Sequence, residues 1–280
     1  MEKYLEIERS IITTYRKKIW SKFIKGVKEF KMVQDGDKIA VCISGGKDSM
    51  LLAKCMQELK KHRQVNFELV FLVMNPGYNE LNKTKIIDNA KLLNIPITMF
   101  DTNIFEAVDK IDDHPCYVCA RMRRGYLYKK AQALGCNKIA LGHHFDDVIE
   151  TVLMGMLYGA QMQTMMPKLH STFHPGMELI RPLYYVKETD IIKWRDKNGL
   201  DFIQCACKVT EKKNLLNNDV SSKREEVKNL INQLRSVYNK VDMNIMRSTQ
   251  NVNLDTLISY RKHGKTFHFL DEYDEKGERK

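Results

Sequence analysis

The clearest chemical signal in the sequence is a run of small and charged residues: Ser44, Gly45, Gly46, Lys47, Asp48 and Ser49. Adjacent glycines let the backbone approach an anion without a Cβ atom in the way, and hydroxyl groups and an ammonium add further donors. The run follows the apolar stretch 39–43 and precedes the stretch 50–56, an order that predicts strand, turn and helix. The unpaired N–H groups and positive end of that helix would complete a phosphate cradle.

This run differs from the two common phosphate-binding motifs. The Walker A loop reads G-x-x-x-x-G-K-S/T, whereas here Asp48 follows the lysine and no glycine stands five positions before Gly46. The G-x-G-x-x-G fingerprint is not matched either. A plain glycine turn is the alternative that the run alone leaves open.

Sulfur is the second candidate chemistry. Three of the seven cysteines lie in apolar or turn surroundings and are interpreted as structural; the other four are Cys116, Cys119, Cys205 and Cys207. Pro115 favours a helix start, which would place Cys116 and Cys119 on one face. In a cytosolic chain such spacings indicate metal binding or catalysis rather than disulfides. A four-thiolate zinc site, a redox pair and a [4Fe–4S] cluster with one iron open to carry sulfur are all compatible with them.

Basic residues follow the first cysteine pair. The nearest are Arg121, Arg123, Arg124 and Lys129. Cations beside a thiol favour the thiolate, and they also bind RNA phosphates. The net charge of +11, from 46 basic against 35 acidic residues, indicates a polyanionic partner, with a merely basic surface as the alternative.

Carboxylates stand where a later strand is expected to end. Asp146 and Asp147 follow the apolar stretch 138–142, at a predicted helix start. They would serve as helix caps or, with Asp48, as ligands for the Mg²⁺ that accompanies ATP. Met74 and Gly142, at the carboxyl ends of two predicted strands, are further candidates for ATP contacts.

These residues must be positioned by an alternating α/β chain. Strands are predicted at 39–43, 65–74, 95–100, 138–142 and 179–185, with helices between them, so we expect a doubly wound parallel sheet. A basic amphipathic helix is predicted over 4–33 and another helix over 221–234. The expected domains are an N-terminal extension at 1–34, a catalytic domain at 35–215, and a helical extension with a charged tail at 216–280.

The chain has 280 residues, 43% of them hydrophobic, which is enough for one large α/β domain with appendages. It has no apolar run of about 18 residues and no secretory signal at its start. We therefore expect a cytoplasmic protein with no membrane span.

The motifs together resemble those of a known family. The 44–49 run is similar to the PP-loop of the ATP pyrophosphatases, which split ATP into AMP and pyrophosphate. With Cys116-x-x-Cys119, Arg123-Arg124-Gly125, the stretch 141–147, Ile180-Arg181-Pro182-Leu183 and Cys205, the chain resembles the tRNA 2-thiocytidine synthetases and, more widely, the iron–sulfur-dependent tRNA thiolases. The match runs from about 35 to 205. The family's usual C-x-L-C-G is replaced by Cys205-Ala206-Cys207-Lys208-Val209, which leaves the role of Cys207 open.

The resemblance implies a Rossmann-like fold and a reaction. ATP would adenylate the C2 oxygen of a tRNA pyrimidine, and sulfur would then displace AMP. Lys47, Asp48, Asp146 and Cys205 would act in catalysis, and Cys116 and Cys119 would hold the [4Fe–4S] cluster together with Cys205. A cysteine desulfurase or sulfide would donate sulfur, and a homodimer is expected.

Other readings remain beside this one. Within the superfamily they are a 2-thiouridine-type thiolase and a lysidine-type enzyme, in which an amine attacks the adenylate. Outside it they are a zinc or redox protein that binds nucleotide and RNA, an RNA-binding module with a vestigial ATP site, and a thiolase acting on a small molecule.

Overall fold

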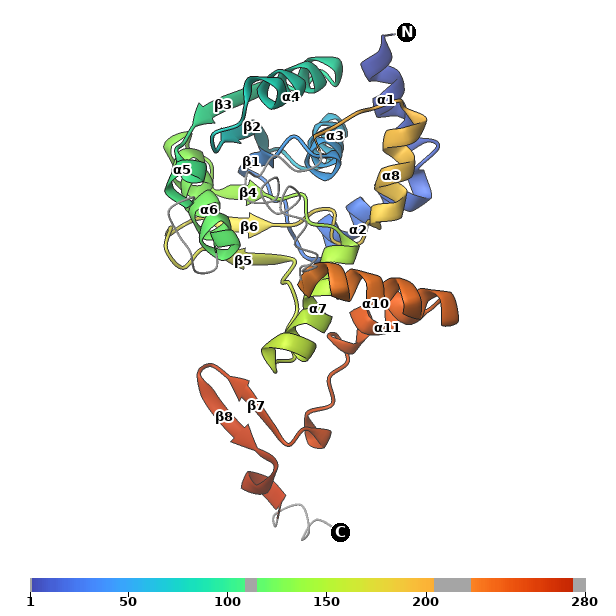
Figure 1. Ribbon diagram of the computed structural model, residues 1–280, viewed down its shortest axis with the longest axis vertical. Helices are drawn as coiled ribbons and strands as arrows, with labels where there is room; N and C mark the ends of the chain where they lie inside the picture. Colours follow the sequence, from blue (N-terminus) through green and yellow to red (C-terminus); the bar gives the residue numbers. More distant parts are fainter. Residues whose placement is uncertain (1, 109–114, 204–222, 274–280) are drawn as a thin grey trace, which may run out of the picture. The chain divides into compact units, whose positions relative to one another are not determined.

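The computed structural model describes residues 2–108, 115–203 and 223–273 (Figure 1). The chain divides into two compact units. The first consists of Met1–Val148 and Met165–Ser222, and the second of Ile149–Thr164 and Lys223–Lys280. Among the described helices, none combines the length and the apolar character needed to cross a bilayer.

A six-stranded sheet in the order β3-β2-β1-β4-β6-β5 forms the centre of the first unit (Figure 1). Its strands are β1 (Lys38–Ile43), β2 (Glu68–Asn75), β3 (Ile97–Asp101), β4 (Lys138–Ala140), β5 (Lys168–His170) and β6 (Glu178–Ile180). All neighbours pair in parallel except β5, which runs antiparallel to β6. The predicted parallel α/β sheet is therefore confirmed, with β1 between β2 and β4.

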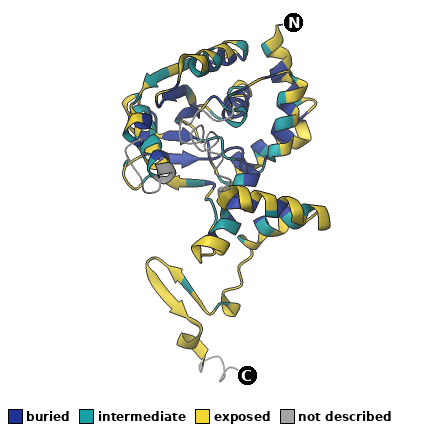
Figure 2. Cartoon of the chain, viewed as in Figure 1, coloured by how far each residue is buried: buried dark blue, intermediate teal, exposed yellow. Residues whose placement is uncertain are grey.

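Helices connect these strands: α3 (Lys47–Lys61), α4 (Glu80–Leu92), α5 (Ile104–Val108), α6 (Pro115–Ala133) and α7 (Phe145–Gly159). The helix α8 (Glu188–Lys197) follows β6. The strands β1, β4 and β6 are almost wholly buried (Figure 2). Because β1 ends at Ile43 and α3 begins at Lys47, the glycine run forms the connection at the carboxyl end of a central strand.

The predicted strand over 179–185 is too long. β6 ends at Ile180, since the chain turns at Pro182, which has no N–H group to continue a ladder. The antiparallel edge strand β5 has no predicted counterpart.

The N-terminal region differs from the prediction of one helix over 4–33. It consists of α1 (Lys3–Ile12), a π-helical turn (Arg16–Trp20) and α2 (Ser21–Glu29). The hydroxyl of Thr13 donates to the Arg9 carbonyl at 2.7 Å, and the hydroxyl of Tyr15 donates to the Lys193 carbonyl at 2.7 Å. A side chain that competes for helix carbonyls and a tertiary contact at the same place explain the break.

The second unit contains α10 (Lys223–Val237), α11 (Val241–Ser248) and a hairpin of β7 (Ser259–Lys262) and β8 (Lys265–His268). Arg224 Nε donates to Glu150 Oε2 at 2.9 Å and ties α10 to the part of α7 that belongs to this unit. The helix predicted over 221–234 is confirmed, whereas the hairpin was not predicted. Its strands are largely exposed (Figure 2).

Candidate active site

The glycine run has the geometry of an anion cradle. Gly45 has φ +85°, and a Cβ atom there would lie 2.6 Å from Ile86 Cγ1 and 2.7 Å from Ile203 Cδ1, so only glycine fits. The Ser49 hydroxyl donates to the Gly46 carbonyl at 2.9 Å and accepts the Ser44 N–H at 3.2 Å, which closes the turn. The first N–H groups of α3 follow directly and carry the positive end of its dipole.

Lys47 is held between two carboxylates. Its Nζ atom lies 3.0 Å from Glu188 Oε1 and 3.2 Å from Asp48 Oδ2. Burial lowers the pKa of Lys47, but the two carboxylates together raise it above its usual value, so the side chain stays charged. Sequence reasoning missed Glu188, because it lies at a helix start far along the chain and carries no motif.

Asp146 holds Glu188, the carboxylate partner of Lys47, in place. Its Oδ2 atom accepts the backbone N–H of Glu188, the first residue of α8, at 2.7 Å. The neighbouring Asp147 accepts the N–H of His144 at 2.9 Å. Each carboxylate thus uses one oxygen to bind backbone at the edge of the site, and Asp146 positions Lys47 through Glu188.

Asp48 has the oxygen best suited to a cation. Its Oδ1 atom is buried and has no hydrogen-bond partner among the described residues, while His144 Nε2 lies 3.8 Å away. Burial raises the pKa of Asp48, and His144 and Lys47 lower it by less. No group of three metal-ligating side chains occurs within 2–108, 115–203 and 223–273. The buried Oδ1 atom of Asp48 fits Mg²⁺, which binds one or two carboxylates together with substrate phosphates.

A cavity of about 380 Å³ opens beside the glycine run. Ser44, Asp48 and Ser49 line one side of it, and the predicted Met74, Gly142 and Asp147 line others. Arg123 and Arg124 of α6 complete the lining, and the buried Nε atom of Arg123 has no hydrogen-bond partner within the described part of the chain. A largely apolar recess of this size, with a few charged and hydroxyl groups beside an anion cradle, can hold a nucleotide.

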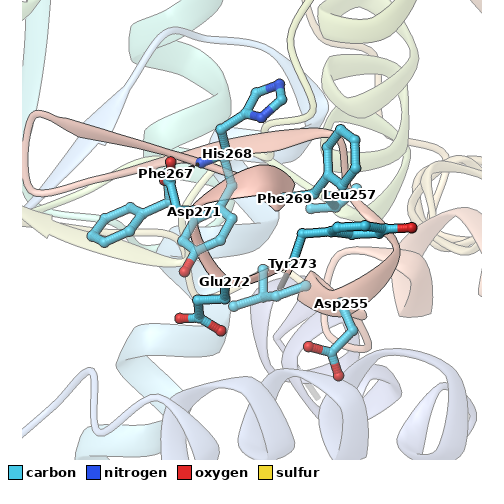
Figure 3. Close-up of a pocket in the computed structure, with 10 residues that line it drawn as sticks. Asp255, Leu257, Phe267, His268, Phe269, Asp271, Glu272 and Tyr273 are labelled. Atoms are coloured by element: carbon cyan, nitrogen blue, oxygen red, sulfur yellow. Dashed lines mark hydrogen bonds between the residues drawn. The ribbon is translucent and has the colours of Figure 1, made fainter. Parts of the chain in front are cut away.

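A different cavity, of about 580 Å³, is lined only by residues of the second unit (Figure 3). The rings of Tyr260 and Phe267 stack there at 5.0 Å, and Asp255, Asp271 and Glu272 lie nearby. Residues of the glycine run do not line it, so the larger cavity is not the candidate active site.

The start of α6 brings the first cysteine pair toward the nucleotide cavity. Cys119 is buried, and the next residue, Ala120, lines that cavity. Pro115 is the first described residue of α6, and Cys116 and Cys119 lie one helical turn apart. The side chain of Cys116 and the whole of Cys205 and Cys207 lie outside the described residues.

Of the cysteines expected to hold an iron–sulfur cluster, the described residues include the side chain of Cys119 alone. Thiolates at the first turn of a helix are stabilised by its dipole. By contrast, burial raises the pKa of the Cys42 thiol to about 12 and raises that of Cys55 as well, so both remain protonated in the core. Of the predicted tRNA-binding residues, Arg121, Arg124 and Lys129 are exposed on α6, and Arg123 is half-buried.

Comparison with known proteins identifies the family to which this chain belongs. A family model described as a PP-loop domain matches residues 16–221. A tRNA-cytidine(32) 2-sulfurtransferase of Vibrio cholerae is 36% identical over 81% of this chain and 72% of that protein. The enzyme of that name from Pelobacter propionicus is 32% identical over 86% of this chain and 87% of that protein. The chain belongs to the PP-loop family of tRNA 2-sulfurtransferases. Membership confirms the resemblance and the enzyme class predicted from the motifs.

The fold agrees with a solved member of the wider group. The U34-tRNA thiolase NcsA from Methanococcus maripaludis, solved with its [4Fe-4S] cluster, superposes with a TM-score of 0.63 over 82% of this chain and 76% of that chain. At 21% identity this similarity shows a shared fold. The predicted Rossmann-like PP-loop architecture is confirmed.

We expect Gly142→Ala to weaken ATP binding. A Cβ atom at Gly142 would lie 3.0 Å from the Ser49 nitrogen and 3.1 Å from the Asp48 carbonyl carbon. These are backbone atoms of the cradle and cannot rotate away. Overpacking costs about 1–3 kcal/mol, so the KM for ATP should rise about 10-fold in a pyrophosphate-release assay. Gly159→Ala, where the nearest atom is 3.8 Å away, is the matched control. A Gly142→Ala protein with an unchanged KM would contradict the placement of the cradle.

Proposed function

We propose that this protein is an ATP-dependent tRNA sulfurtransferase that adenylates the C2 oxygen of a cytidine and replaces that oxygen with sulfur. The observation that carries the proposal is one cavity with two walls of different chemistry. The phosphate cradle forms one wall through Ser44 and Asp48, and the cysteine-bearing helix α6 forms another through Ala120, Arg123 and Arg124. Activation by ATP and attack by sulfur need such proximity.

The residues of the cradle stabilise charge during activation. The first N–H groups of α3 and Lys47 bind the phosphates and neutralise the departing pyrophosphate. Asp48 would hold the Mg²⁺ that accompanies ATP, and that ion would neutralise phosphate charge. Asp146 acts as a positioning residue, because it orients Glu188 and, through it, Lys47. The pyrimidine C2 oxygen becomes a good leaving group once it carries AMP.

Cys116, Cys119 and Cys205 would hold a [4Fe–4S] cluster, which supplies the sulfur atom to the activated carbon when bound. We further propose a cysteine desulfurase or sulfide as sulfur donor, a homodimer as the assembly, and the cytoplasm as the location. Arg121, Arg123, Arg124 and Lys129 would bind tRNA phosphates. The catalytic domain would span 35–215, between extensions at 1–34 and 216–280.

The test is reconstitution under anaerobic conditions. Protein with iron and sulfide, ATP, Mg²⁺ and an unmodified tRNA transcript should form 2-thiocytidine, detected by nucleoside mass spectrometry, with one pyrophosphate released per thiolated base. Thiolation of uridine instead would place the chain with the other tRNA thiolases. Zinc held in place of iron, with no thiolated nucleoside formed, would overturn the proposal.

A further inference from the structure

A second hollow lies against the nucleotide cavity. It measures about 380 Å³ and is formed by α6 and the loop between β5 and β6. We name it the Phe173 groove; its principal lining residues are Arg121, Arg124, Tyr128, Leu169, Phe173 and His174. Ala120 and Arg124 line both the groove and the nucleotide cavity, so the two hollows share a wall.

The ring of Phe173 is exposed to solvent, although its loop is held by hydrogen bonds and by ring stacking. The residue is 80% exposed, although its neighbours are fixed. The His174 N–H donates to the Ser171 hydroxyl at 3.1 Å, and the His174 ring stacks on Tyr128 of α6 at 5.0 Å. Gln132 of the same helix donates to the Pro175 carbonyl at 3.2 Å. Leu169, 37% exposed, lines the same groove as Phe173, so the two side chains together give it an apolar surface that a ligand can cover.

The positive charge of the groove indicates what kind of ligand it can bind. Arg121 and Arg124 are both exposed at its wall, and no acidic side chain is among the described residues that line it. The matching ligand therefore carries negative charge together with a flat apolar face. A nucleotide has both, in its phosphate and its base, and single-stranded nucleic acid is generally bound by cations beside exposed aromatic rings.

We propose that the Phe173 groove binds a nucleotide that neighbours the reacting one, with its base stacked on Phe173 and its phosphate held by Arg121 and Arg124. The inference rests on the proposed tRNA substrate and adds where the strand beside the reacting base is held. Because stacking tolerates any base, the groove recognises an unpaired strand rather than a sequence. The shared wall then lets one nucleotide occupy the groove while the next enters the cavity.

The experiment measures binding of an unmodified tRNA transcript to the full chain without ATP, by fluorescence anisotropy. Phe173→Ala and Phe173→Leu should both weaken binding about 10- to 100-fold, because neither side chain can stack on a base. Phe173→Trp should bind like the wild type, and tRNA should quench its added fluorescence. Phe269→Ala is the control: it removes a ring of the second unit that is 48% exposed, and it should bind tRNA like the wild type. Arg121→Gln should lower the slope of the logarithm of the tRNA binding constant against the logarithm of the salt concentration by about 1, which corresponds to one lost phosphate contact.

Each outcome of this experiment either supports the inference or overturns it. If the wild type binds tRNA and Phe173→Leu binds equally well, stacking is wrong while the proposed function stands. If the wild type binds no tRNA, the inference and the proposed function both fail. A change in oligomeric state of Phe173→Ala by size-exclusion chromatography would assign the ring to an interface between copies and overturn the inference. Unchanged ATP binding by the variants shows that they are folded.

Discussion

Replacing Lys47 with alanine is expected to reduce pyrophosphate release about 10²- to 10³-fold while leaving the iron content unchanged. The lysine stands at the first position of α3, beside the phosphate cradle, and remains charged between Asp48 and Glu188. A fixed donor aimed at developing charge contributes a rate factor of about this size. Two of the three proposed cluster thiols, Cys116 and Cys119, lie on a different element, α6, so cluster assembly should not depend on this side chain.

Two control variants separate charge at the phosphates from general damage. Lys83→Ala removes a half-buried lysine on α4 that pairs with Glu80 at 2.7 Å and should not change the rate. Glu188→Gln removes the charge that holds Lys47 but keeps the lysine, so it should retain most of the activity. A Lys47→Ala protein that consumed ATP at the wild-type rate would refute the assignment of the cradle.

Replacing Cys119 with alanine is expected to abolish both cluster binding and thiolation. The wild type should carry about four irons per chain after anaerobic purification, and this variant should lose nearly all of them together with the visible absorption of the cluster. ATP binding should persist, since Cys119 does not line the nucleotide cavity. Iron and sulfide analysis, combined with the thiolation assay, measures both effects.

Other cysteines provide the comparison. Cys136→Ala changes a buried thiol in the core around β1 and β4 and should keep its iron. Cys116→Ala and Cys205→Ala should behave like Cys119→Ala, while Cys207→Ala should retain the cluster. Full iron content in Cys119→Ala, or one zinc per chain that is lost on replacing any one of the four cysteines, would contradict the three-ligand assignment.

The sequence was most informative where one local rule determines structure. The glycine run between two apolar stretches predicted the turn from β1 to α3, and Pro115 predicted the start of α6. Asp146 and Asp147 were expected either to cap or to bind metal, and the structure shows both accepting backbone N–H groups. For the turn, for α6 and for the bond of Asp147, the signal lies within a few residues of the feature, whereas Asp146 binds the N–H of Glu188, 42 residues away.

Features that depend on distant contacts were missed. The break at Thr13 depends partly on a bond from Tyr15 to Lys193, and the role of Glu188 depends on Lys47, far away in the chain. Phe173 resembles an ordinary loop residue until its loop is seen stacked on α6. The β7–β8 hairpin lies in a stretch of mixed polarity without clean alternation, so no period revealed it.

The paired carboxylates around Lys47 have a consequence for which form of the nucleotide is accepted. Without ATP the lysine is already neutralised by Glu188 and Asp48, so a phosphate that binds it exchanges one anion for another. The exchange leaves negative carboxylate charge beside a negative nucleotide, and that repulsion is relieved only by a further cation. The site should therefore discriminate between free ATP and its magnesium complex, and the free nucleotide should compete poorly with the complex even at high concentration.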